Sequence, residues 1–104
     1  MRRDQIKTSK VYSNGRGQFR IVTGEGDYPL FPGQTDHDCI EYETVTVGKR
    51  GPVAVYRRDG CYRTPYTHHA TRSSFATWAA REATDEEATM VRRTLEIARF
   101  GGES

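Results

Sequence analysis

Asn14 and Gly15 are the feature that most restricts how this chain can fold. They separate two short β-favouring runs, residues 10–12 and 18–22. Both residue types tolerate the positive φ that a tight hairpin turn requires, and Gly17 can add a bulge. The chain is therefore expected to begin its ordered part with an antiparallel hairpin.

Further strands are expected up to residue 58. Residues 24–38 contain three glycines and two prolines and are expected to form a long loop. Loops of this length are usually functional lids or interface arms. Its apolar side chains would anchor the loop or contact a neighbouring subunit, and they are Tyr28, Leu30 and Phe31. Residues 39–47 alternate in polarity, but the two faces change character halfway, which indicates a bulge or a strand that passes from one partner to another. Residues 48–51 form a turn, and residues 52–57 are the returning strand. Four or five antiparallel strands result.

Two helices are expected after the strands. The first begins at Thr71, whose hydroxyl can cap the opening turn, and the second begins at Thr84, where Glu87 completes a capping box. Gly101 is expected to end the second helix. Apolar stripes at helical spacing are formed by Phe75, Trp78 and Ala79 in the first helix and by Val91, Leu95 and Ala98 in the second.

These elements predict an α+β fold, with a small antiparallel, barrel-like sheet of four or five strands followed by two C-terminal helices. All 104 residues are expected to form a single domain with a flexible N-terminus (1–8), a β-rich part (9–58), and a connection with two helices (59–104). Only 35% of residues are apolar and the mean hydropathy is −0.82, so a homo-oligomer is expected to hide additional surface. No apolar run is long enough for a membrane span or signal peptide, which favours a cytoplasmic location.

Charge is unevenly distributed along the chain. Residues 1–81 carry 13 Lys and Arg against 8 Asp and Glu, whereas residues 82–104 carry 3 against 6. Thirteen of the 16 basic residues are Arg, whose planar fork grips phosphate in two places. Codon usage in a GC-rich genome produces the same bias, so both explanations remain open.

The connection between the last strand and the first helix is the candidate ligand site. Arginines and tyrosines alternate there, and guanidinium groups hold phosphates while bases stack on tyrosine rings. The free N–H groups of the helix start, with the hydroxyls of Thr71, Ser73 and Ser74, would add an anion cradle. The opposing interpretation is a solvated strand end with an ordinary helix cap. Predicted phosphate ligands are Arg57, Arg63, Thr71 and Arg72, and predicted base contacts are Tyr62, Tyr66 and His69.

Metal binding and catalysis have weaker support. Cys39 and Cys61 lie too far apart for a local zinc knuckle and are expected to be reduced thiols. Neither cysteine lies in a recognisable nucleophile motif, although His68 is conceivable as a general base for phosphodiester hydrolysis. The sequence therefore predicts a binding protein with no metal, no cofactor and no catalytic residue.

Two segments, residues 10–22 (KVYSNGRGQFRIV) and residues 71–79 (TRSSFATWA), resemble those of small bacteriophage-encoded proteins, including anti-defence sponges of the Thoeris anti-defence type. The resemblance implies an oligomeric, non-catalytic protein in the host cytoplasm. Such a protein would hide a cyclic ADP-ribose-like or cyclic nucleotide messenger between subunits and so counter a bacterial immune pathway. Alternatives are a small nucleic-acid-binding module of SH3-like barrel type and a cyclic-nucleotide hydrolase.

Overall fold

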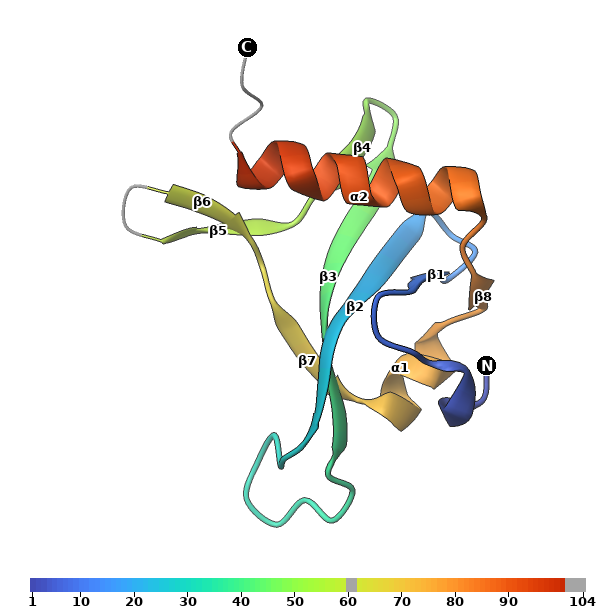
Figure 1. The fold of residues 1–104 in the computed structure, drawn as a ribbon, viewed down its shortest axis with the longest axis vertical. Coiled ribbons are helices and arrows are strands. Elements are labelled where there is room, and N and C mark those ends of the chain that lie inside the picture. The colour runs from blue at the N-terminus through green and yellow to red at the C-terminus, as the bar shows by residue number, and fades with distance from the viewer. Residues whose placement is uncertain (60–61, 101–104) are drawn as a thin grey trace.

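One antiparallel sheet forms the centre of the protein (Figure 1). The computed structural model describes residues 1–59 and 62–100, and the side chains of residues 56–63 lie outside that description. Within the described residues the sheet has six strands in the order β4-β3-β2-β1-β8, with β7 pairing with another part of β3. Its strands are β1 (Val11–Ser13), β2 (Gln18–Asp27), β3 (Asp38–Gly48), β4 (Gly51–Ala54), β7 (His68–Thr71) and β8 (Arg81–Glu82).

The remaining elements lie around this sheet. A separate two-stranded hairpin consists of β5 (Tyr56–Asp59) and β6 (Tyr62–Pro65). The helices are the short 3-10 helix η1 (Arg3–Gln5), α1 (Arg72–Trp78) and α2 (Asp85–Arg99). The predicted α+β class, an antiparallel sheet followed by two C-terminal helices, is confirmed. The sheet is open rather than barrel-like, because no described pairing joins the edge strands β4 and β8.

The predicted hairpin between β1 and β2 is present. The Asn14 side-chain oxygen accepts hydrogen bonds from the backbone N–H groups of Arg16 and Gln18. Gly15 and Gly17 have φ of 76° and 86°, a region that favours glycine. This local turn chemistry fixes the register in which Val11 pairs with Ile21.

The strand β3 changes partners along its length, as its alternating pattern indicated. Its first half, from Cys39 to Tyr42, pairs with β7, and its last residues pair with β4. The register irregularity lies on the neighbouring strand β2, between Val22 and Gly24. The strand β3 thus pairs with β7 near its start and with β4 near its end.

Two predicted boundaries in this region were wrong. The long loop is limited to residues 28–37, because Gly24 to Asp27 continue β2 and pair with β3. A backbone ladder needs no apolar side chains, so the glycine-rich sequence concealed this extension. The expected single strand at residues 52–57 is interrupted at Val55, whose N–H donates to the Thr44 carbonyl before the chain enters β5.

Two hydrophobic clusters occupy opposite faces of the sheet. Tyr12, Val22 and Ile40 pack with Phe75 of α1, whereas Phe19 and Val45 belong to the cluster of α2. The predicted stripes are confirmed, since Phe75, Ala79, Val91 and Leu95 are buried and Trp78 and Ala98 pack against these clusters. The predicted caps are also present, at Thr71 for α1 and at Thr84 with Glu87 for α2. Gly101 lies outside the described residues.

The N-terminal segment is packed rather than frayed, contrary to the prediction for residues 1–8. Ile6 is 0% exposed and belongs to the α1 cluster. The Tyr12 hydroxyl donates to the Gln5 carbonyl and accepts from the Lys7 N–H, and the Met1 nitrogen donates to the carbonyls of Ala76 and Ala79. A single apolar residue in a polar segment shows no periodicity, so its burial depends on the shape of the core.

None of the helices in the described part of the chain is long and apolar enough to cross a membrane.

Candidate functional site

A stack of four rings and one guanidinium group lies on the sheet face that α1 covers only in part. The Arg20 guanidinium carbon is 4.0 Å from the centre of the Trp78 ring and 4.5 Å from that of Tyr42. Tyr42 stacks on His68 with ring centres 5.2 Å apart and planes 15° apart, and His68 contacts Tyr66 at 4.7 Å. We call Tyr66, His68, Tyr42, Arg20 and Trp78 the aromatic stack.

The alternation of strand side chains places these residues together. Successive residues of a strand face opposite sides of a sheet. Phe19 and Ile21 pack with α2, so Arg20 between them faces the α1 side. His68 on β7 lies directly opposite Tyr42 on β3, and Trp78 is the last residue of α1. Three strands and one helix therefore build the site.

Arg20 carries a charge that none of the described carboxylates balances. Within the described part of the chain it forms no ion pair or hydrogen bond, and its Nε is buried without a partner. Burial lowers the pKa of Arg20, and the nearby Tyr42 hydroxyl acts in the opposite direction. A buried donor without a partner is costly, so Arg20 is an unusual member of this sheet face.

His68 is the second group of the stack with an unsatisfied polar atom. Its Nε2 is buried and has no hydrogen-bond partner. Burial lowers the pKa of His68, with smaller contributions of the same direction from the charges of Arg20 and His69. These two buried unpartnered atoms, the ones found among the described side chains, therefore belong to one stack, in which both residues contact Tyr42.

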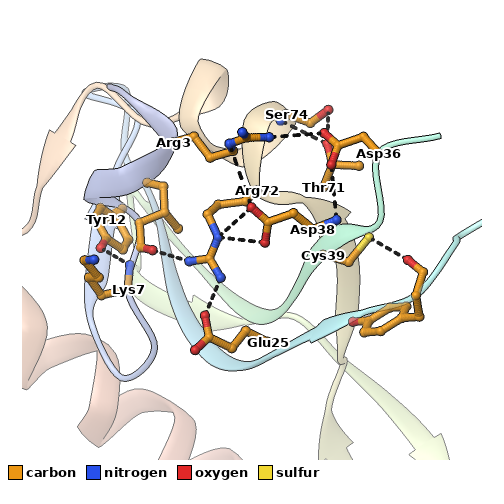
Figure 2. Close-up of polar contacts among 12 residues, drawn as sticks. Arg3, Lys7, Tyr12, Glu25, Asp36, Asp38, Cys39, Thr71, Arg72 and Ser74 are labelled. Carbon is orange, nitrogen blue, oxygen red and sulfur yellow. Dashed lines mark hydrogen bonds and ion pairs between the residues drawn. The ribbon is translucent and has the colours of Figure 1, made fainter. Parts of the chain in front are cut away.

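Arg72, in contrast, is fully engaged (Figure 2). Its Nε donates to the Asp38 carboxylate at 3.0 and 3.2 Å, and its terminal nitrogens donate to the Ile6 carbonyl and the Glu25 carboxylate. Burial by itself lowers the pKa of Arg72, but the hydrogen bonds with Glu25 and Asp38 raise it overall. Arg72 was predicted to bind a phosphate. Its side chain instead links α1 to the N-terminal segment and to the β2–β3 hairpin.

Two cavities flank Arg72, with volumes of about 510 Å³ and about 330 Å³. Both share walls formed by Arg72, Glu25 and Asp38, and Asp27 adds another carboxylate to the larger one. An anion entering the larger cavity would meet three carboxylates and one arginine whose donors are occupied, so its electrostatics disfavour phosphate. The smaller cavity also has Arg3 and Lys7 in its wall, which balance the carboxylates of Asp4, Glu25 and Asp38.

The structure separates the other residues predicted for the site. Tyr66 joins the aromatic stack and is 41% exposed. His69 is exposed, and its Nδ1 lies 3.1 Å from the Tyr28 hydroxyl. Thr71 caps α1 by accepting a hydrogen bond from the Ser74 N–H at 3.1 Å. The side chains of Arg57, Tyr62 and Arg63 lie outside the described residues, although their backbones pair within the β5–β6 hairpin.

Sequence reasoning overlooked Arg20 and assigned Trp78 to the core alone. A usable signal was present in residues 18–22, where Gln18 and Arg20 share a strand face with the apolar Val22. A charged residue on a face that continues into the core is a candidate for function. Its partners, however, come from distant parts of the chain.

The described residues provide neither a metal-binding cluster nor an exposed thiol. Across the described residues no cluster of three or more His, Cys, Asp and Glu side chains could hold a metal ion. Cys39 is a buried free thiol whose Sγ donates to the Tyr28 carbonyl at 3.1 Å. Cys61 lies outside the described residues, as does any contact between the two cysteines.

Comparison with known proteins identifies no relative. No protein family, curated protein or solved structure matches this chain. Functional reasoning therefore rests on the chemistry of the aromatic stack.

Proposed function

We propose that this protein binds a nucleotide-like ligand, an aromatic ring that carries phosphate, at the aromatic stack and does not cleave it. The observation that carries the proposal is the Arg20 cation between ring systems, which no carboxylate of the described side chains balances and whose terminal nitrogens donate to none of them.

Arg20 is held in a suitable geometry for a phosphate. Contacts with the Trp78 and Tyr42 rings restrict the plane of the guanidinium, and the donors of a guanidinium project from its edge. The terminal nitrogens donate to no described residue, so two parallel bonds to one phosphate are available. A pre-oriented fork loses less conformational entropy on binding.

The rings of the stack supply contacts for the base. Tyr66 is 41% exposed and Trp78 is half-buried, so both retain accessible ring surface. Bases stack on such surfaces with little dependence on their identity.

Capture is favoured over turnover because the stack contains no carboxylate, thiol or aliphatic hydroxyl. His68 is its one residue able to act as a general base near neutral pH, and it lies between the rings of Tyr42 and Tyr66. A hydrolase would need a group that activates water or attacks the phosphate.

A narrower form of the proposal is the sequestration of a cyclic nucleotide signal by a homo-oligomer, as the resemblance to phage anti-defence proteins implies. Exposed Val53 and Val55 support an oligomer, because they are 57% and 40% exposed next to the stack's sheet face. A second copy covering them would enclose a ligand bound at Arg20.

Calorimetry with a panel of linear and cyclic nucleotides tests the proposal. We expect at least one to bind with a dissociation constant in the micromolar range or below. Arg20→Gln should weaken it by about tenfold or more, because a hydrogen bond to a charged group contributes about 1.5–3 kcal/mol. Arg81→Gln is the matched control, since Arg81 is exposed and paired with Glu87.

Two results would contradict the proposal. If no nucleotide binds, or if Arg20→Gln binds as the unaltered protein does, the aromatic stack is not a nucleotide site. Chromatography of the ligand after heat denaturation of the complex tests turnover, and recovery of cleaved product would favour the hydrolase.

A further inference from the structure

We infer that the nucleotide site continues as a track for a single-stranded oligonucleotide, which runs from Arg20 to the cationic turns at one end of the sheet. This inference rests on the proposed function of the aromatic stack and specifies its ligand class. It is carried by three further cations, Arg16, Lys49 and Arg50.

The two turns that carry these cations lie side by side. Arg16 belongs to the β1–β2 turn, and Lys49 and Arg50 form the β3–β4 turn. The Val47 N–H donates to the Gly17 carbonyl at 2.8 Å, which joins the two turns at the same sheet end (Figure 1). All three side chains are exposed, and none forms an ion pair with a residue that the structure describes.

Among the described side chains, the sheet surface between Arg20 and the turns carries no charge. Cross-strand pairing places Gln18 and Thr46 in one row, and Thr44 lies opposite Arg20. These are uncharged residues on the same face as the aromatic stack. Bases and sugars can lie over such a row without meeting a carboxylate.

The length of the surface favours more than one nucleotide. Arg16 lies in the turn that precedes β2, and Gln18, the first residue of β2, is about 7 Å from Arg20 along the strand. Successive phosphates of one strand can contact Arg20 and the turn cations in sequence. Open antiparallel sheets with stacking side chains suit single strands, whose unstacked bases are free to contact rings.

Fluorescence anisotropy with a labelled ten-residue oligothymidylate tests this inference, with thymidine monophosphate as competitor. The oligonucleotide should bind at least about tenfold more tightly than the mononucleotide, since further phosphates and bases add contacts. In the triple variant Arg16→Gln/Lys49→Gln/Arg50→Gln, the slope of log affinity against log salt should become shallower by about 2, because each phosphate contact on a single strand contributes about 0.7. Mononucleotide affinity should stay within about twofold of its original value in this variant, since Arg20 is retained.

A matched triple variant, Arg2→Gln/Arg92→Gln/Arg93→Gln, removes the same charge from the N-terminal segment and α2, and its salt slope should change less. The inference is overturned if the oligonucleotide binds no better than the mononucleotide, if the turn variant keeps the original slope, or if polyglutamate competes equally well. In these cases mononucleotide binding at Arg20 still supports the proposed function. Absence of binding by both thymidine ligands would refute this inference alone if another nucleotide of the panel binds at Arg20, and would refute both proposals if none does.

Discussion

The guanidinium of Arg20 lies over the indole ring of Trp78, with 4.0 Å between the guanidinium carbon and the ring centre. Trp78 is the chain's single tryptophan. The Trp78 indole also lies close to Gln18, whose side-chain oxygen is 3.5 Å from Nε1. The intrinsic fluorescence of the protein therefore reports directly on the proposed site.

Ligand binding should change the emission of Trp78. A nucleobase or phosphate arriving at Arg20 alters the electrostatic surroundings of the indole, so titration should produce a saturable change in intensity or wavelength. Arg20→Gln should shift the emission of the free protein and remove the response to ligand, whereas Arg81→Gln should retain both. An equal response in the Arg20 variant would place the ligand elsewhere.

Arg20→Met should change the free energy of unfolding little. Loss of the cation–π contacts costs about 1 kcal/mol, and removal of an unbalanced, half-buried charge offsets a similar amount. Urea denaturation should therefore find a net change below about 1 kcal/mol, given these opposing contributions. A loss above about 2 kcal/mol would indicate that Arg20 serves the fold rather than a ligand.

Arg72→Met should destabilise the protein strongly. The Arg72 side chain is 13% exposed, and its removal leaves Asp38, Glu25 and the Ile6 carbonyl without their donor. We expect a loss of about 1–3 kcal/mol in urea denaturation, because the Ile6 carbonyl and the partly exposed carboxylates of Glu25 and Asp38 lose a charged donor. Under conditions in which the variant is folded, its nucleotide affinity should equal that of the unaltered protein. This result would contradict the sequence-based prediction that Arg72 binds a phosphate.

The double variant Arg72→Met/Asp38→Asn provides the control for this effect. It removes one of the stranded carboxylate charges and should recover part of the lost stability. Equal stability of the single variant and the unaltered protein would contradict the structural role of Arg72.

Stability should depend on pH through His68. Its folded pKa lies below the ordinary 6.5, mainly because of burial and secondly because of Arg20. The unfolded chain therefore binds the proton first, so the contribution to stability is complete above pH 6.5 and is lost as the pH falls from 6.5 to the folded pKa. NMR titration should find this low pKa, and Arg20→Gln should raise it. An unchanged pKa in that variant would disprove their proximity.

Glu87 should titrate far below a free glutamate. Hydrogen bonds from Arg81 and from the Thr84 backbone lower its pKa to about 2. Because this folded pKa is depressed, its contribution to stability is present above the ordinary value of 4.5 and is lost as the pH falls from 4.5 towards 2. Carboxyl-carbon NMR should find this value, and Arg81→Gln should move it upward. A normal pKa would mean that the bidentate pair does not form in solution.

Local signals in the sequence were sufficient for much of the fold. Asn14 with Gly15 specified a turn because few residue types accept positive φ, and Thr84 with Glu87 specified a helix start because both satisfy free N–H groups. The alternation after Cys39 identified a strand with two partners. Each signal acts over a few residues, so the sequence alone could place it.

The site required information that no local pattern contains. Arg72 and Arg20 are the same residue type. Cross-strand register and helix packing bring Glu25 and Asp38 to Arg72, whereas the described side chains in contact with the Arg20 guanidinium are aromatic rings. Whether a charge is neutralised depends on which distant side chains approach it, and side-chain partners are set by tertiary packing. The sequence by itself thus determined the turns, caps and apolar stripes of this protein. The tertiary structure decided which of the two arginines is paired with carboxylates.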